Sequence, residues 1–503
     1  MHHHAAVEGN TRRIGAETTS QNSTYLILAA NRTHRKDPTD SFNYYTGGWN
    51  ITNPHYIFSV AYSATGPFVF AVVWFIFFAV FLLCFCCRCC FCSRNSYGYS
   101  RTAYAVSVTC LAIFTIAAIG GIAFVFAGQD KFQDSIVNTT SFVLHEADDV
   151  IVKLGDVLHD LLAAKNSSVG RAVLPDDLKA NIDSTGKTIN AVTAQFRNIT
   201  TKNSQDIRSL LSPLYYPVLM SPFRVLGLLL ISLFATSLKA VECAVILILA
   251  VIGWILVAAT FMMSGVFLLV HNAVADTCVA LDEWLQNPTA HSALEEIIPQ
   301  VDNQTAQEIS SVTKGVTFGV VGMLNGIITN VSNADVPPDV GPPLYFHQNG
   351  PLVPVACNPY DSNLTDRKCA DGEVSLKDAP QVWKKYVCQV SGGICSSPGR
   401  ITPDDYDQLA STANTSYALY EDTPFVVGLI DSTYLKELFG GISRDYCPGL
   451  SKFTSWMYLG FISSSVAVML SLLIWIFYAR ERRHRAYTKK VDSRSSAESP
   501  FAS

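Results

Sequence analysis

Long uncharged apolar runs alternate with polar stretches along the chain. Runs of about 18 or more such residues are typical of membrane-spanning helices. Four runs reach this length, at residues 68–87, 102–128, 243–270 and 453–479. A fifth, VLGLLLISLFATSL between Arg224 and Lys239, would extend only ~21 Å as a helix, short of a ~30 Å hydrocarbon core. A buried or re-entrant segment is therefore the alternative for that run.

Glycosylation sequons indicate how often the chain crosses. They fall only before residue 68, between 128 and 224, and between 271 and 453, which predicts that these three blocks share the lumenal side. An even number of crossings must then separate the second block from the third, and residues 225–270 accommodate two helices. The sequence predicts five spans, and the candidate glycosylated residues are Asn22, Asn31, Asn50, Asn138, Asn166, Asn198, Asn303, Asn330, Asn363 and Asn414.

Positive charge predicts the orientation. Arg88, Arg94, Arg101 and Lys239 fall in the two inner loops, and a basic tail follows the last span, so the positive-inside rule places the N-terminus outside and the C-terminus inside. The predicted segments are an extracellular N-terminal segment (1–66), span 1 (67–88), a cysteine- and arginine-rich cytosolic loop (89–102), span 2 (103–127), a first extracellular helical domain (128–221), span 3 (222–238), a cytosolic turn (239–242), span 4 (243–270), a second extracellular domain (271–453), span 5 (454–479) and a basic cytosolic tail (480–503).

Both outer blocks have helical periodicity, which makes the predicted fold class an all-α membrane protein. In the first block, apolar stripes at 143–161 and 178–199 flank Leu174–Pro175–Asp176–Asp177, predicting an antiparallel helical hairpin. Acidic Glu146, Asp148 and Asp149 are interpreted as its solvated face, with a calcium site as the alternative. The second block is helical at 309–327 and again at 427–438, with a proline-rich looped insertion from residue 336.

Six cysteines lie in the second outer block, an even number in an oxidising compartment. Fifteen pairings exist in principle. Proximity along the chain favours the pairs Cys357–Cys369 and Cys388–Cys395, which leaves Cys278–Cys447 to tie the exit of span 4 to the entry of span 5.

Two clusters lie at the inner boundary. The stretch LLCFCCRCCFC is the usual setting for S-acylation, because juxtamembrane cysteines beside basic residues are acylated; plain interface cysteines and a metal site are its alternatives. Its candidates are Cys84, Cys86, Cys87, Cys89, Cys90 and Cys92. The tail is predicted to contact anionic lipid, or to act only as a topology anchor, through Arg480, Arg482, Arg483, Arg485, Lys489 and Lys490.

No nucleophile elbow, zincin helix, P-loop or dinucleotide fingerprint occurs, so no enzyme, catalytic residue, metal site or cofactor is predicted. Asp276, Asp282 and Glu283, just outside span 4, are interpreted as cap and surface residues. The spans carry almost no charge, which disfavours a transporter. Ala117-x-x-x-Gly121 in span 2 permits close helix packing, within the chain or in a homodimer.

The whole layout resembles the tweety and prominin families of five-span proteins. The stretches NRTHRKDPTDSFNYYTGGWNITNPHY (31–56), LVHNAVADTCVALDEW (269–284), NLTDRKC (363–369) and YARERRHR (478–485) are similar to a plant branch of five-span proteins. The third span of those proteins looks longer than the one here. The resemblance implies a plasma-membrane glycoprotein without catalytic residues: prominins associate with sterols and curved membrane, and tweety proteins were proposed as anion channels.

The expected function is that of a lipid-binding organiser of the plasma membrane, acting on curvature, microdomains or membrane contacts. Its expected partners are membrane lipids, either sterol or anionic phospholipid, together with a second copy of the chain. The net charge of −5 gives no reason to expect nucleic acid. The alternatives are a tweety-like anion channel and an adhesion or receptor module acting through the extracellular domains.

Overall fold

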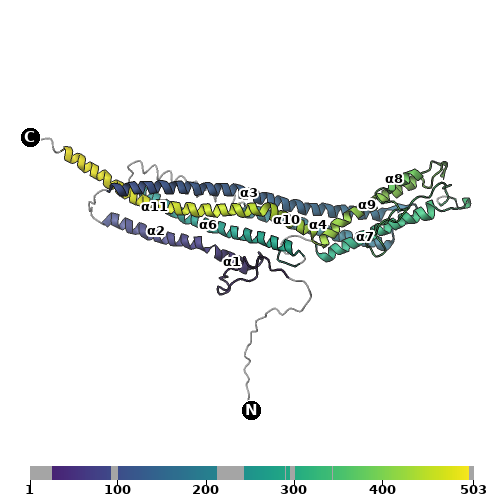
Figure 1. The fold of residues 1–503 in the computed structure, drawn as a ribbon, viewed down its shortest axis with the longest axis horizontal. Helices are drawn as coiled ribbons and strands as arrows, with labels where there is room; N and C mark the ends of the chain where they lie inside the picture. Colours follow the sequence, from purple (N-terminus) through teal and green to yellow (C-terminus); the bar gives the residue numbers. More distant parts are fainter. Residues whose placement is uncertain are drawn as a thin grey trace, which may run out of the picture.

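Long helices run along most of the molecule, which forms a rod (Figure 1). The computed structural model describes residues 25–91, 100–211, 243–288, 290–294, 301–341 and 344–497. Its α-helices are α1 (Pro54–Ser63), α2 (Thr65–Phe91), α3 (Arg101–Asn166), α4 (Asp176–Leu211), α6 (Cys243–Gln286), α7 (Asn303–Ile327), α8 (Ala379–Trp383), α9 (Pro403–Ile430), α10 (Thr433–Gly441) and α11 (Cys447–Ala497).

Short elements join these helices. The 3-10 and π segments are η1 (Ile328–Ser332), η2 (Pro338–Val340), η3 (Lys384–Tyr386) and η4 (Ile442–Tyr446). Two antiparallel hairpins pair β1 (Ser168–Val169) with β2 (Ala172–Val173) and β3 (Val390–Ser391) with β4 (Ile394–Cys395). Strand content is small, in agreement with the predicted all-α class.

Within the described residues, five helices are long and apolar enough to cross a membrane. Four of them, within α2, α3, α6 and the α10–α11 region, overlap the predicted spans 67–88, 103–127, 243–270 and 454–479. The fifth is α7, which the sequence analysis placed in the second outer block, and its mean hydropathy of 1.3 is below the 2.2–2.7 of the others. The predicted span 222–238 and the turn 239–242 lie outside the described residues.

The four apolar helices that match predicted spans lie side by side as a row. The main contacts run from α2 to α6, from α6 to α11 and from α11 to α3, in the order seen in Figure 1. Only 22% of the most apolar window is buried in α2 and in α3, against 44% in α6 and 56% in α11. The outer members of the row therefore expose most of their apolar side chains.

Small residues bring α3 and α11 together. A Cβ atom on Gly121 would lie 2.4 Å from the Ser464 Oγ, and one on Gly460 would lie 2.8 Å from the Gly121 carbonyl oxygen. The neighbouring Gly120 meets nothing within 4 Å. Gly121 of the Ala117-x-x-x-Gly121 pair is thus used for packing within the chain, because only glycine permits this approach, whereas Ala117 is exposed and Ala118 is buried instead.

The helices continue past the predicted segment limits. α3 runs unbroken through residues 127 and 128, and α6 runs unbroken through residues 270 and 271. α11 starts before residue 454 and continues through the basic tail. No proline interrupts these junctions, so each predicted span and the helix beyond it form one element. The 66 residues of α3 extend roughly 99 Å at 1.5 Å per residue.

The end of the rod away from the C-terminus, here called the distal body, contains the distal half of α3 with α4, α7 and α9 (Figure 1). The predicted hairpin forms from α3 and α4, joined by β1 and β2. Its two stripes do not face only each other: α7 and α9 pack into the same core. The two predicted outer blocks, expected as separate helical domains, therefore form one body, because α7 and α9 bury the same apolar stripes that join α3 to α4. The residues buried in this core include Val150, Leu154, Val157, Leu161, Ile182, Ile189, Phe196, Ile309, Val316, Val320, Leu419 and Val426.

Candidate functional site: a buried carboxylate where the spans meet the distal body

Asp276 lies near the distal end of α6 and its side chain is fully buried. Arg35 donates two hydrogen bonds to it, from Nη1 to Oδ2 (2.6 Å) and from Nη2 to Oδ1 (2.8 Å). The Tyr56 hydroxyl donates a third to Oδ2 (3.1 Å), and the Arg32 Nε lies 3.3 Å from Oδ1. Both carboxylate oxygens are therefore paired with donors.

The pairing explains how a charge can be buried at this position. An isolated carboxylate is very costly to desolvate, whereas a bidentate guanidinium compensates both its charge and its lone pairs. The Arg35 side chain is 15% exposed and that of Arg32 is 48% exposed. Arg35 is thus the principal partner, and Arg32 adds a second, more hydrated positive charge.

This carboxylate anchors residues 25–53, which we call the N-terminal clip. Two further hydrogen bonds hold the clip: the Leu26 amide donates to the His291 carbonyl (2.8 Å), and the Trp49 Nε1 donates to the Thr277 Oγ1 (2.9 Å). The Ala29 amide donates to the Glu283 carboxylate. α1 begins directly after the clip. The Asn53 side chain caps this helix by accepting a hydrogen bond from the His55 amide, which fixes the direction of the chain at the end of the clip.

Around these polar contacts lies an apolar core. It buries Trp49 and Tyr56 from the N-terminal side against Trp284 of α6 and Phe439 of α10, whose rings lie 4.7 Å apart. Burial, together with the nearby Asp276 carboxylate, raises the pKa of Tyr56 well above its ordinary value, so this hydroxyl remains a donor at physiological pH.

A disulfide lies beside this junction. Cys278, two residues after Asp276, has its sulfur at bonding distance from that of Cys447 at the first residue of α11, with the Cα atoms 5.8 Å apart. This is the pair expected from the sequence. It fastens α6 to α11 where the N-terminal clip docks, so clip, spans and distal body meet at one fixed point.

The structure corrects the interpretation of the acidic residues here. Asp276 was expected to be a cap or surface residue, but it is the buried centre of the junction, and Glu283 accepts from the clip. Asp282 accepts from Ser443 of η4 and is exposed. Sequence spacing could not find the site, because Arg35 and Asp276 are 241 residues apart. Its two sides nevertheless fall in two of the stretches that carry the family resemblance, 31–56 and 269–284.

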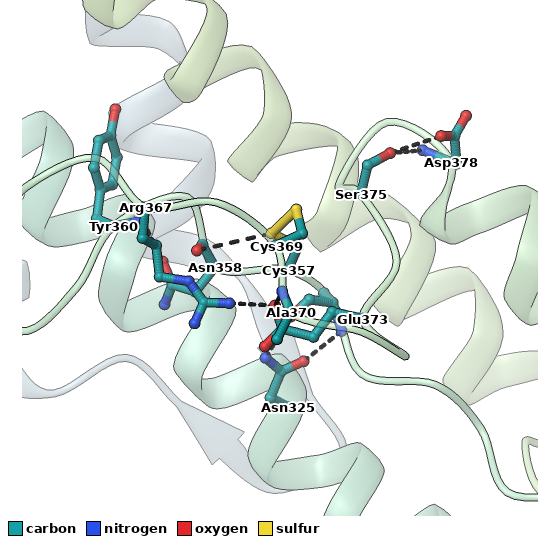
Figure 2. Close-up of a disulfide and its surroundings, with 11 residues drawn as sticks. Asn325, Cys357, Asn358, Tyr360, Arg367, Cys369, Ala370, Glu373, Ser375 and Asp378 are labelled. Atoms are coloured by element: carbon teal, nitrogen blue, oxygen red, sulfur yellow. Dashed lines mark hydrogen bonds and ion pairs between the residues drawn. A yellow bond between two sulfur atoms is a disulfide. The ribbon is translucent and has the colours of Figure 1, made fainter.

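The other two expected cysteine pairs hold the distal insertion. The sulfurs of Cys357 and Cys369 are at bonding distance, as are those of Cys388 and Cys395. Cys357–Cys369 is called the insertion disulfide from here on. Figure 2 shows it with the Arg367–Glu373 ion pair beside it and Asn325 of α7 close by.

Polar contacts attach the insertion to the distal body. The Asn325 amide bridges both backbone groups of Ala356, each at 2.7 Å, and the Asn358 Nδ2 donates to the Phe318 carbonyl (3.0 Å). Glu373 lies close to both sulfurs of the insertion disulfide. Because these sulfurs are bonded to each other, neither is a thiolate, and the three groups do not form a cysteine-based metal-ligand set.

Acidic side chains collect along α3 and α9 of the distal body. Glu146, Asp149, Lys153, Phe425 and Tyr434 are among the residues lining a cavity of about 330 Å³, with the Lys153 Nζ 5.1 Å from the centre of the Phe425 ring. Asp148 and Asp149 are exposed, as expected for a solvated face.

Beyond the cavity, Asp422 of α9 faces two carboxylates of α3. Burial, followed by the charges of Asp160 and Asp156, raises the pKa of Asp422 to about 6. Desolvation also raises the pKa of Asp160. Like charges are therefore held together in this helix contact at neutral pH.

The predicted glycosylation asparagines are accessible wherever the structure describes them. Asn50 is partly exposed, and Asn22 lies outside the described residues. The other eight are exposed: Asn31, Asn138, Asn166, Asn198, Asn303, Asn330, Asn363 and Asn414. None of the nine described positions is buried.

The two inner-boundary clusters are described only in part. α2 continues to Phe91, so Cys86, Cys87, Cys89 and Cys90 belong to a helix that extends past the expected limit at residue 88, and Cys84 is exposed. Cys92 and the side chains of the other four lie outside the described residues.

In the tail, α11 continues as a helix, with Lys489 exposed and Arg482 and Arg485 half-buried. The Arg485 guanidinium lies 5.1 Å from the centre of the Tyr104 ring of α3. The side chains of Arg480, Arg483 and Lys490 lie outside the described part of the tail.

Polar and apolar layers alternate between α6 and α11. Ser465 donates to Thr260 (2.8 Å), and His271 lies 3.0 Å from the Thr454 hydroxyl nearer the distal end. Between these layers, Phe267 and Phe461 stack with ring centres 5.1 Å apart, and both are buried. The polar layers of this helix pair are thus separated by an apolar one.

Comparison with models of known protein families and with curated proteins found no match. The row of apolar helices and the junction around Asp276 are the features of the described chain from which a function can be inferred.

Proposed function

We propose that the chain is a multi-pass plasma-membrane glycoprotein that binds lipid and organises the surrounding bilayer, without enzymatic activity. The observation that carries the proposal is the row formed by α2, α6, α11 and α3. The described helices of this row expose many apolar side chains, whereas a pore requires helices closed around a polar path. The outward-facing set includes Val69, Val73, Ile76, Val80, Ile113, Ile116, Ile119, Ile248, Ile255 and Phe477.

The proposed topology keeps five spans, with the N-terminal clip and the distal body outside the cell. Both lie toward one end of the row and the C-terminal part of α11 lies toward the other (Figure 1), which supports a common compartment for the first two. The proposal treats residues 222–238 as the third span.

We place α7 outside the bilayer, although its length and composition would allow it to cross. It packs against α4 and α9 of the distal body. Its first turns carry Gln304, Gln307 and Glu308, and Lys314 near its middle lies 3.6 Å from Asp366. Ionisable groups at membrane depth are costly, so these residues favour a position in the aqueous body.

The inner boundary supports lipid attachment in this proposal. The acylation candidates continue α2 out of the apolar region, and the basic residues continue α11 on the same side. Basic residues near an anionic leaflet contribute about 1 kcal/mol each. Mass-shift labelling after hydroxylamine treatment tests the acylation part: a shift of one or more acyl groups is expected, and none would eliminate it.

Reconstitution tests the function itself. The protein is placed in vesicles of phosphatidylcholine with or without sterol or phosphatidylserine, and co-purifying lipid, vesicle shape and chloride flux are measured together. We expect lipid enrichment and altered vesicle shape. A selective chloride conductance that substitutions in α6 or α11 abolish would instead establish the anion channel. Saturable binding of a soluble ligand with no effect on lipid would establish the adhesion or receptor function.

A charge variant isolates the contribution of the tail. Replacing the six basic tail residues with glutamine should reduce enrichment of phosphatidylserine and leave sterol enrichment unchanged, because only the first depends on charge. Lys187→Gln with Lys202→Gln, two exposed lysines of the distal body, is the control and should change neither.

A further inference from the structure

The short helix α1 exposes large apolar side chains beside the polar His55 and Ser63. Tyr56, Ser59 and Val60 face the interior, while Ile57 is 48% exposed and Phe58 is 46% exposed. The helix contains no Asp, Glu, Lys or Arg. Clustered exposed apolar side chains are normally covered by protein or lipid, so the apolar part of the exposed side of α1 requires a covering surface.

A loop of the N-terminal clip extends this apolar surface. Phe42 is 55% exposed, and its ring meets that of Tyr62 edge-on, with centres 5.7 Å apart. Phe58 and Tyr62 are four residues apart and so share one face of α1. Phe42 has a φ of +61°, a backbone region that a bulky residue rarely adopts. The fold thus holds an aromatic ring outward at a position where local sterics disfavour it.

These residues, Phe42, Ile57, Phe58 and Tyr62, are called the interfacial patch. Its position identifies what covers it. α1 ends at Ser63 and α2 begins at Thr65, so the patch begins where the apolar surface of α2 begins. That surface continues through Val69 and Ile76, which are 59% and 60% exposed. A patch continuous with a lipid-facing surface meets the same bilayer at headgroup and upper acyl depth.

Basic residues lie on the same segment. Lys36 is exposed, with its Nζ 6.0 Å from the centre of the Tyr44 ring, and the Arg32 side chain is 48% exposed even though it faces Asp276. Aromatic and basic side chains together are characteristic of membrane interfaces, where rings lie among the headgroups and cations approach phosphates.

We infer that the interfacial patch inserts into the leaflet on the distal-body side and that phospholipid is its occupant. The inference deepens the proposed function and rests on it, since it requires the row of helices to be embedded in a bilayer. An inserted patch adds volume to one leaflet only. Because the same segment is held by Asp276 and Arg35, the position of the patch in the leaflet is coupled to the junction with the distal body.

Photo-crosslinking in the intact protein tests this. The photoreactive residue p-benzoylphenylalanine replaces Phe58, and the full chain is reconstituted in vesicles of phosphatidylcholine and phosphatidylserine. Two matched positions serve as controls: Ile76 in α2, and Val152, which is 59% exposed on α3 in the distal body. Lipid adducts are expected at positions 58 and 76 and none at position 152. A second probe at Tyr62, on the same face, should also yield lipid adducts.

The outcomes separate the inference from the proposed function. Lipid adducts at position 76 without any at 58 and 62 would overturn the inference while the proposed function stands. Absence of lipid adducts at 76 as well would overturn both. An adduct at 58 with a second copy of the chain, or with another protein, would identify a different occupant and reject lipid insertion. Equal lipid labelling at position 152 would show that the labelling is non-specific and count against the patch.

Discussion

Replacing Asp276 with asparagine removes the negative charge at the centre of the junction and nearly preserves the shape of the side chain. Arg35 then faces an amide that cannot compensate its charge, and the Tyr56 hydroxyl retains at most a neutral acceptor. The N-terminal clip loses its strongest attachment to α6, while the rest of its apolar contacts stay in place.

The free-energy cost of Asp276→Asn follows from how deeply the ion pair is buried. Breaking a buried ion pair by removing one partner costs about 3–5 kcal/mol, because the other charge remains desolvated. The Arg35 side chain is 15% exposed and that of Arg32 is 48% exposed, so both can partly rehydrate. We therefore expect the lower end, about 3 kcal/mol, which raises the population of detached clip by about two orders of magnitude.

Limited trypsin digestion of the full chain in nanodiscs measures this population. When opening and closing are fast, cleavage follows the fraction of open molecules. Cleavage within residues 25–53 should be about 100-fold faster in Asp276→Asn than in the wild type. Asp183→Asn is the matched control: it removes a carboxylate from a more exposed pair with Lys165, worth ~0.2–1 kcal/mol, and should leave clip cleavage unchanged.

A double variant separates charge from shape. Asp276→Leu with Arg35→Met leaves an apolar pair, and replacement of a buried ion pair by packed apolar residues is often nearly neutral. Clip cleavage should return most of the way to the wild-type rate. If Asp276→Asn and the wild type were cleaved equally fast, the junction would not depend on the buried charge, and the reasoning would be refuted.

Three further outcomes are expected. The raised pKa of Asp422, about 6 against 3.8 for an ordinary aspartate, means that its charge destabilises the folded distal body above about pH 6. The free energy of unfolding should therefore rise as the pH falls from 7 toward 4, as measured by thermal unfolding at each pH. Asp422→Asn should flatten this pH dependence. At pH 7 the variant should stabilise the distal body by on the order of 1 kcal/mol, after allowance for the partial exposure of the residue. Replacing Cys278 and Cys447 with serine should lower the unfolding temperature more than removing the insertion disulfide, since closing their loop contributes about 5 kcal/mol against about 3 in the chain-entropy model; equal shifts would contradict that ordering. Gly121→Leu should lower the stability to heat in detergent by ~1–3 kcal/mol, because the larger side chain overpacks α3 against α11. Gly120→Leu should be tolerated, since its side chain would meet open space. Equal effects of the two substitutions would argue against close packing of α3 and α11 at Gly121.

Local features of the sequence were informative wherever one stretch of chain contains the whole signal. The apolar runs predict four helices that the structure places in one row, since a run of uncharged apolar residues needs no distant partner to be recognised. The hairpin of α3 and α4 follows from two stripes and one proline-containing turn. Short-loop proximity also suggested two of the cysteine pairs that the structure brings to bonding distance, and left Cys278–Cys447 as the third.

The sequence by itself determined a helical chain with several apolar helices and cysteines in compatible positions. Only the tertiary structure decided that the two outer blocks share one core, that Gly121 packs against α11, and that Asp276 is buried under Arg35. The physical reason is range: helical periodicity and hydropathy are encoded within a few turns, whereas a buried ion pair between residues 241 positions apart depends on how separate helices pack.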